Sequence, residues 1–150
     1  MRLFGLIVAV AAGAALLPSG AAADRVYHSE HLRFAPVEGA PLRSGFVENI
    51  KANGPMIYAH EIFVLNGARP STTYSVTRDF FFGDTECKGD PVPPNEPIAT
   101  LRTNASGNAR GSVVVRPSQI TIDGDHGVMW TVRDGDTVVY QTACTVVTLD

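Results

Sequence analysis

Four histidines are the side chains with the broadest capacity for metal binding and acid–base chemistry: His28, His31, His60 and His126. His28 and His31 could begin a metal site with either of the other two, because neutral imidazole is a common metal ligand. Residues three apart on a strand point to opposite faces, so this pair converges only with a turn or bulge. The same alternation separates His60 from the adjacent Glu61 and argues against a shared acid–base role.

Signatures of covalent catalysis and of nucleotide binding are missing from the sequence. It contains no G-x-S-x-G motif around a serine nucleophile and no glycine-rich phosphate loop between a strand and a helix. We therefore expect a protein without catalytic residues, metal ligands or cofactors. The alternative is a small secreted metal-binding protein or hydrolase that uses the four histidines.

The two cysteines, Cys87 and Cys144, predict a disulfide bond. In an exported protein an even number of cysteines indicates a disulfide first, and neither a CxxC pair nor a zinc-type spacing is present. The bond would close a loop of about 58 residues, for which the chain-entropy model gives at most ~4 kcal/mol of stabilisation. We therefore expect a structural bond between them.

Acidic residues cluster in turn sequences. Asp123-Gly124-Asp125 and Asp134-Gly135-Asp136 could bind Ca²⁺ together with Asp84, Glu86 and Asp90, because this ion prefers carboxylate oxygens. Neither segment has the spacing of an EF-hand loop, and Asp-Gly is also common turn chemistry. We favour the turns over a calcium site.

The amino-terminal residues have the pattern of a secretory signal peptide. Arg2 precedes an apolar run from Leu3 to Leu17, and Ala21–Ala23 supplies small residues for cleavage. We expect residues 1–23 to be removed and residues 24–150 to form one secreted domain, extracellular or periplasmic. A retained anchor is the alternative, and no later stretch is apolar enough to span a membrane.

The charge distribution argues against a nucleic-acid partner. The sequence has 12 Lys and Arg against 15 Asp and Glu, which gives a net charge of −3. The charges are scattered, with no run of five like signs and no basic stripe.

The mature sequence alternates between short β-rich runs and turn residues, which is typical of an all-β domain. We expect seven or eight strands in an antiparallel β-sandwich, because two packed sheets bury such strands. Asn104–Asn108 predicts one hairpin, and Asp134-Gly135 predicts another in which both residues adopt positive φ. The predicted strands are 32–37, 45–51, 56–65, 74–82, 98–103, 111–116, 128–132 and 137–148.

The phenylalanines 80–82 divide between two faces of one strand. Phe80 and Phe82 share the face of Tyr74 and Val76, so we expect them in the core. Phe81 lies on the other face. It either packs beneath the proline-rich loop that follows or is exposed as a contact point.

Residues 70–76, with the sequence PSTTYSV, resemble the P-x-T-x-Y-x-V stretch of fibronectin type III and related immunoglobulin-like domains. Residues 101–108 are similar to a turn of secreted bacterial immunoglobulin-like domains. The resemblance implies an immunoglobulin-like sandwich in which the Tyr74 hydroxyl bonds the backbone upstream and Val76 points into the core.

Together these patterns predict a secreted, non-enzymatic binding or surface-interaction module with a protein or a surface glycan as partner. The expected contact surface is the cysteine-anchored loop 83–97, with Phe81, Asp84, Glu86 and Lys88. An inhibitor of another secreted enzyme is a further alternative, because inhibitory loops have no universal sequence.

Overall fold

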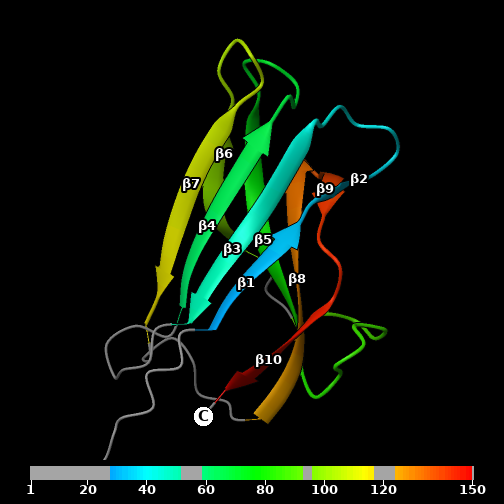
Figure 1. Cartoon of the computed structure of the whole chain (residues 1–150). Helices are drawn as coiled ribbons and strands as arrows, with labels where there is room; N and C mark the ends of the chain where they lie inside the picture. The colour runs from blue at the N-terminus through cyan, green and yellow to red at the C-terminus, as the bar shows by residue number, and fades with distance from the viewer. Residues whose placement is uncertain (1–27, 52–58, 93–95, 117–123, 150) are drawn as a thin grey trace, which may run out of the picture.

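The computed structural model describes residues 28–51, 59–92, 96–116 and 124–149, and its described residues contain strands but no helix. In these described ranges, ten strands form two antiparallel sheets that pack face to face (Figure 1). The predicted β-sandwich is therefore confirmed. The strands are β1 (His28–Arg33), β2 (Ala35–Pro36), β3 (Ser44–Lys51), β4 (Ala59–Asn66), β5 (Thr73–Phe81), β6 (Pro97–Arg102), β7 (Ala109–Val115), β8 (Gly124–Asp134), β9 (Thr137–Gln141) and β10 (Thr145–Leu149).

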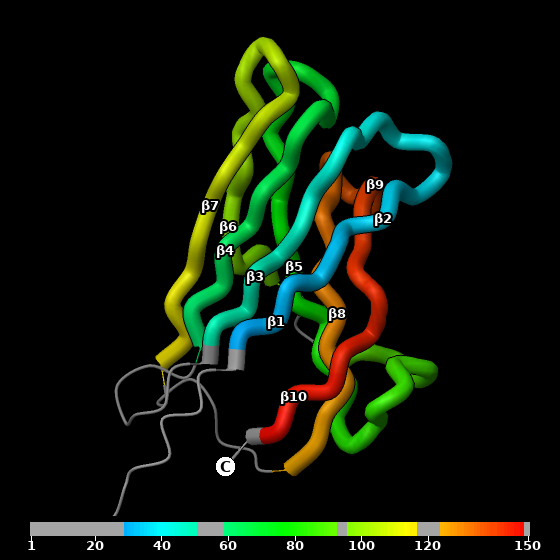
Figure 2. Tube along the Cα trace, viewed as in Figure 1, coloured from blue at the N-terminus to red at the C-terminus, as the bar shows by residue number. Residues whose placement is uncertain are grey.

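The four-stranded sheet has the order β1-β3-β4-β7, and the six-stranded sheet has the order β2-β9-β8-β5-β6 with β10 also paired to β8. The chain passes from the first sheet to the second at Phe34, between β1 and β2. β9 and β10 follow one another along the same strand, β8 (Figure 2). No helix among the described residues is long and apolar enough to cross a membrane. The predicted signal peptide lies outside the described residues.

The core lies between the two sheets and is built from alternate residues of their inner faces. Val76 is fully buried, as the sequence predicts, and Phe80 packs against the core from the same face. The prediction for Phe82 was wrong, because its side chain is 63% exposed. It follows Phe81, the last residue of β5 that pairs with β8, and its ring lies 5.0 Å from that of His126.

Within the part of the chain that the structure describes, the Tyr74 hydroxyl makes no hydrogen bond to the backbone, contrary to what the family resemblance implies. Its oxygen lies 3.5 Å from Tyr140 Oη, and the Tyr140 hydroxyl donates a hydrogen bond of 2.8 Å to the Pro41 carbonyl. Tyr140 is therefore the tyrosine that ties the core to a loop.

The predicted hairpin around Asn104–Asn108 was wrong. β6 pairs with β5 in one sheet and β7 pairs with β4 in the other, so this turn joins the two sheets. The turn is held from outside, since Thr103 Oγ1 donates to the Arg69 carbonyl at 2.7 Å. Gly107 lies at φ 75°, and a Cβ there would collide with the Ala68 backbone.

The predicted hairpin between β8 and β9 is confirmed, with a different pair of central residues. Asp134 pairs with Thr137, so the loop residues are Gly135 and Asp136. Only Gly135 has positive φ, at 59°. This geometry fits a type II′ turn, in which glycine occupies the first central position.

Two predicted strands divide into shorter ones, which explains the larger strand number. The expected strand 32–37 is interrupted at Phe34, and strand pairing extends back to His28. The expected strand 137–148 is interrupted at 142–144. There the Thr142 hydroxyl accepts a hydrogen bond from the Trp130 amide at 3.1 Å.

Candidate functional site

The predicted disulfide between Cys87 and Cys144 is present. It joins the loop after β5 to the segment between β9 and β10, across a sequence separation of 57. Such bonds persist in oxidising environments, which is the compartment that the bond indicates for this protein.

In the loop that the sequence predicts as a contact surface, the charged side chains of Asp84, Glu86 and Lys88 bind to other groups of the same loop. Asp84 accepts hydrogen bonds from the amides of Glu86, Lys88 and Gly89 at 2.8–2.9 Å. These amide donors, Gly89 first and then Glu86, lower the Asp84 pKa, because they stabilise the charged carboxylate. The Lys88 ammonium forms an ion pair with Glu86.

Phe81 is 5% exposed, which agrees with the alternative that it packs beneath the loop and corrects its inclusion in the contact surface. It points to the outer face of the six-stranded sheet, where it pairs in register with Gly127 of β8. The disulfide-bonded loop lies over this position, since Asp84 and Cys87 are the nearest groups to Gly127. Phe81 therefore supports the loop from beneath.

The three histidines whose side chains the structure describes do not converge. His31 and His60 lie on the outer face of the four-stranded sheet, separated by β3, whereas His126 is buried on β8 in the other sheet. His126 Nδ1 accepts a hydrogen bond from the Gly83 amide at 3.0 Å. The side chain of His28 lies outside the described residues. In the described ranges, no group of three or more His, Cys, Asp or Glu could hold a metal ion.

The acidic turn sequences are also separated. Asp125 accepts a hydrogen bond from the Thr148 hydroxyl at 2.7 Å near the start of β8, and Asp134 pairs with Arg69 at the end of the same strand. An eleven-residue strand spans roughly 35 Å. These two turns therefore cannot share one calcium ion.

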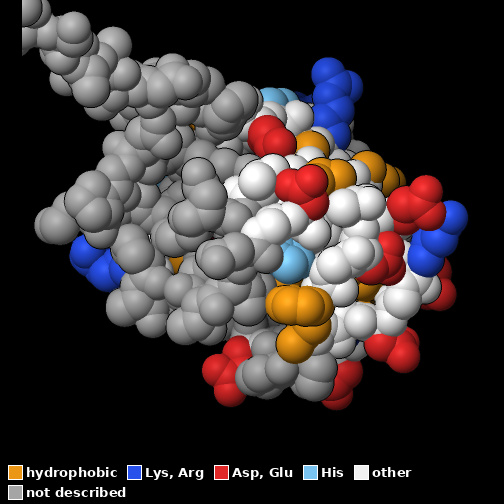
Figure 3. All heavy atoms as spheres, turned by 90° about the horizontal axis from the view of Figure 1, so that it is seen from below, with side chains coloured by type: hydrophobic (Ala, Val, Ile, Leu, Met, Phe, Trp, Pro, Cys, Tyr) orange, Lys and Arg blue, Asp and Glu red, His pale blue; other side chains and the backbone are white. Residues whose placement is uncertain are grey.

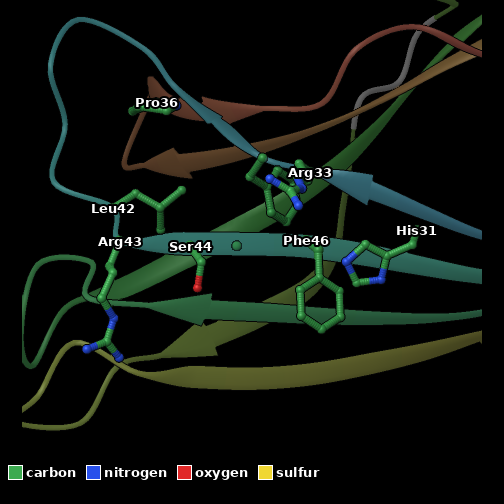
Figure 4. Close-up of a pocket in the computed structure, with 9 residues that line it drawn as sticks. His31, Arg33, Pro36, Leu42, Arg43, Ser44 and Phe46 are labelled. Atoms are coloured by element: carbon green, nitrogen blue, oxygen red, sulfur yellow. The ribbon is translucent and has the colours of Figure 1, made fainter.

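A groove of about 340 Å³ opens between β1, β3 and the loop that joins β2 to β3. Figure 4 shows its side chains, with Arg33, His31 and Phe46 at one end and Leu42, Arg43 and Ser44 at the other. Pro36, Phe34 and Gly45 complete the lining. Both arginines, His31 and Ser44 are exposed, so a ligand can reach them.

Strand alternation and register create this groove. Arg33 of β1 pairs with Phe46 of β3, and His31 pairs with Glu48, so all four side chains project from the outer face. The rings of His31 and Phe46 pack at a centroid distance of 4.2 Å and an angle of 31°. The result is an aromatic surface of two tilted rings beside a guanidinium group.

The two arginines of the groove have no ion-pair partner among the residues that the structure describes. Elsewhere, Arg69 pairs with Asp134 at 2.7 Å and Arg78 with Glu61 at 3.1 Å. A guanidinium group presents a planar set of donors that matches a carboxylate or a phosphate. By contrast, acidic side chains predominate over the end of the sandwich seen in Figure 3. The groove is therefore suited to an anionic ligand.

The sequence did not reveal this groove. Its lining comes from β1, β3 and a loop, and the sequence placed the start of the first strand four residues too late, at Leu32 instead of His28. Arg33 and Phe46 become neighbours only through the pairing register of β1 and β3. The one sequence feature that could have indicated the groove is the pair of arginines on either side of residues 34–42.

Comparison of the chain with protein-family models, with curated proteins and with solved structures finds no match. The protein is an antiparallel β-sandwich with one disulfide bond and a cationic groove on the outer face of its four-stranded sheet.

Proposed function

We propose that this protein is a secreted, non-enzymatic binding module of the immunoglobulin-like type, and that it binds a carboxylate-bearing glycan in the groove. The observation that carries the proposal is the pair of exposed, unpaired arginines, Arg33 and Arg43, on a groove that also presents a packed aromatic pair. The disulfide bond supports export to an oxidising compartment.

The functional groups of the groove match those of an acidic sugar chain. Arg33 and Arg43 can each form charge-assisted hydrogen bonds with a carboxylate. The rings of His31 and Phe46 offer an apolar surface to the face of a sugar ring. Ser44 lies at the same end as Arg43, and its hydroxyl accepts a hydrogen bond from the Asn66 amide at 3.2 Å. The Ser44 hydroxyl can therefore donate to a sugar oxygen.

Calorimetric titration with oligogalacturonate, at low and at high salt, tests the proposal. We expect binding that weakens as salt is raised, because exposed charges are screened. A charge-assisted hydrogen bond contributes about 1.5–3 kcal/mol, so Arg33→Ala and Arg43→Ala should each weaken binding about tenfold or more. A neutral maltooligosaccharide should not bind measurably.

Arg102→Ala is the matched control, because Arg102 is also exposed but lies on β6 of the other sheet. It should leave the affinity unchanged. Three results would contradict the proposal: no binding of oligogalacturonate, equal binding of the neutral oligosaccharide, or equal loss of affinity in Arg102→Ala. Equal binding of polyglutamate would show recognition of charge alone and would exclude a glycan-selective site.

A further inference from the structure

A row of polar side chains crosses the inner face of the four-stranded sheet. Glu30 of β1 pairs with Asn49 of β3, and Asn49 pairs with Glu61 of β4. Asn49 and Glu61 are each 2% exposed, and Val47 and Phe63 lie in the adjacent core row. Three acceptor-bearing side chains therefore lie next to one another on the inner face, with Glu30 half-buried.

Two donors face this row from the other sheet. Arg78 of β5 and Trp130 of β8 are paired in register, and Arg78 Nε lies 3.1 Å from Glu61 Oε1. Trp130 is 1% exposed, and its indole lies near enough to Glu61 to favour the charged carboxylate. We call these five residues, Glu30, Asn49, Glu61, Arg78 and Trp130, the polar layer.

Each residue of the polar layer carries a buried atom that makes no aligned hydrogen bond, although Arg78 Nε and the Trp130 indole both lie near the Glu61 carboxylate. The acceptors are Glu30 Oε2, Asn49 Oδ1 and Glu61 Oε2, and the donors are Arg78 Nε and Trp130 Nε1. Among the described residues, these five atoms are all the buried side-chain nitrogens and oxygens that lack a partner. Buried polar groups in proteins are almost always hydrogen-bonded. The gathering of five unsatisfied atoms in one place therefore indicates a bound molecule or ion.

The mixture of donors and acceptors identifies the bound species. A metal cation could bind the three oxygens, but it would leave both N–H groups unpaired and would be repelled by Arg78. An anion could accept from the two donors, but it would lie against two carboxylates. A water molecule donates and accepts, and buried waters make about three hydrogen bonds each, so about two waters would satisfy five atoms.

We propose that the polar layer is an internal hydration site, in which a small cluster of ordered water molecules bridges the two sheets between Asn49, Glu61 and Trp130. The site is distinct from the groove, which lies on the opposite face of the same sheet. The waters connect side chains that are close together but not aligned for direct hydrogen bonds.

Trp130 provides a selective probe, because it is the only tryptophan in the chain and gives one indole N–H signal. In ¹⁵N-edited NOESY and ROESY spectra of the full-length protein, we expect a dipolar cross-peak between this proton and water. The opposite signs of dipolar and exchange peaks in the ROESY spectrum separate bound water from hydrogen exchange. Absence of the dipolar peak in the wild-type protein would overturn the proposal.

Asn49→Leu removes one side chain that would bind the water and replaces it with a side chain of similar volume. We expect the cross-peak to be lost in this variant. Ile62→Leu, on the outer face of β4, is the matched control and should retain it. Full intensity in Asn49→Leu would contradict a water bridge through Asn49. If Asn49→Leu does not fold, a crystal structure of the wild-type protein decides the question, because a direct Trp130–Glu61 hydrogen bond in a dry layer would refute the proposal.

Discussion

Gly127 of β8 lies directly against Cys87, so close that a Cβ atom at residue 127 would be 2.7 Å from the Cys87 sulfur. The same Cβ would collide with the Asp84 carbonyl oxygen. The disulfide-bonded loop therefore approaches the sheet at a position that only glycine can occupy without displacement. This contact closes the loop over Phe81.

We expect Gly127→Ala to destabilise the protein by about 1–3 kcal/mol, because overpacking forces the loop backbone to move. Urea unfolding followed by Trp130 fluorescence measures the change. Gly89→Ala is the control, since a Cβ there would make an ordinary contact of 3.5 Å with Asp84 Oδ2. Equal stability of Gly127→Ala and wild type would contradict the close packing of the loop.

Removal of the disulfide should lower the free energy of unfolding by about 2–4 kcal/mol, because the unfolded chain is no longer constrained. Cys87 has φ 52°, a left-handed conformation that glycine adopts without strain. We therefore expect Cys87→Gly/Cys144→Ala to be more stable than Cys87→Ala/Cys144→Ala. Urea unfolding of both double variants tests this order, and the reverse order would argue against the backbone conformation of Cys87.

Phe81 and Phe82 should respond in opposite ways to truncation. Phe81 is 5% exposed and Phe82 is 63% exposed. Phe81→Ala should cost about 3–5 kcal/mol, as for buried aromatic residues, whereas Phe82→Ala should cost no more than about 0.5 kcal/mol. Thermal unfolding of the two variants makes the comparison. A larger loss for Phe82→Ala would mean that the strand end is packed differently.

The Asp84 loop should loosen in acid. Since backbone amides lower the Asp84 pKa in the folded state, its stabilising contribution is complete above the unfolded value of about 3.9. The contribution is lost as pH falls through the lower folded pKa. We expect the amide signals of Glu86, Lys88 and Gly89 to shift together in that range, and Asp84→Asn to abolish the shared titration. Independent shifts would contradict the shared acceptor.

Glu61 should reduce stability at higher pH. Burial raises its pKa, and the Arg78 charge and Trp130 offset this only in part. The folded state therefore binds more protons than the unfolded state above about pH 4.5, so stability falls as pH rises from there through the folded pKa.

We expect Glu61→Gln to gain stability relative to wild type as pH rises from about 4.5 through the folded pKa of Glu61, as measured by urea unfolding at several pH values. The unpaired Arg78 of the variant contributes an offset that does not change with pH in this range. Asp79, whose pKa burial also raises, should add to the trend in Glu61→Gln/Asp79→Asn. A constant difference between Glu61→Gln and wild type would contradict the raised pKa.

Features that depend on local sequence were predictable. The alternation of Tyr74, Val76 and Phe80 identified an inward face, and the Asp134-Gly135 turn identified a hairpin. The cysteine pair followed from its number and spacing. Each of these features is determined by residues close together in the chain or by the chemistry of one residue type.

Features that depend on distant partners were not predictable in the same way. Alternation assigned Phe82 to the core but could not show that the pairing of β5 with β8 ends at Phe81. The turn before β7 looks like a hairpin, yet Thr103 and Gly107 are held by the loop around Ala68 and Arg69. The groove requires the register of β1 against β3, and no local pattern encodes that register.

The disulfide bond also divides the chain mechanically. If the protein is pulled from its two ends, the residues between Cys87 and Cys144 remain inside a covalent loop and cannot extend. A separation of 57 residues corresponds to about 200 Å of contour length at the reach of an extended chain. Under tension, the strands from β6 to β9 therefore cannot be extended. The molecule lengthens through the amino-terminal strands, β5 and the carboxyl-terminal β10.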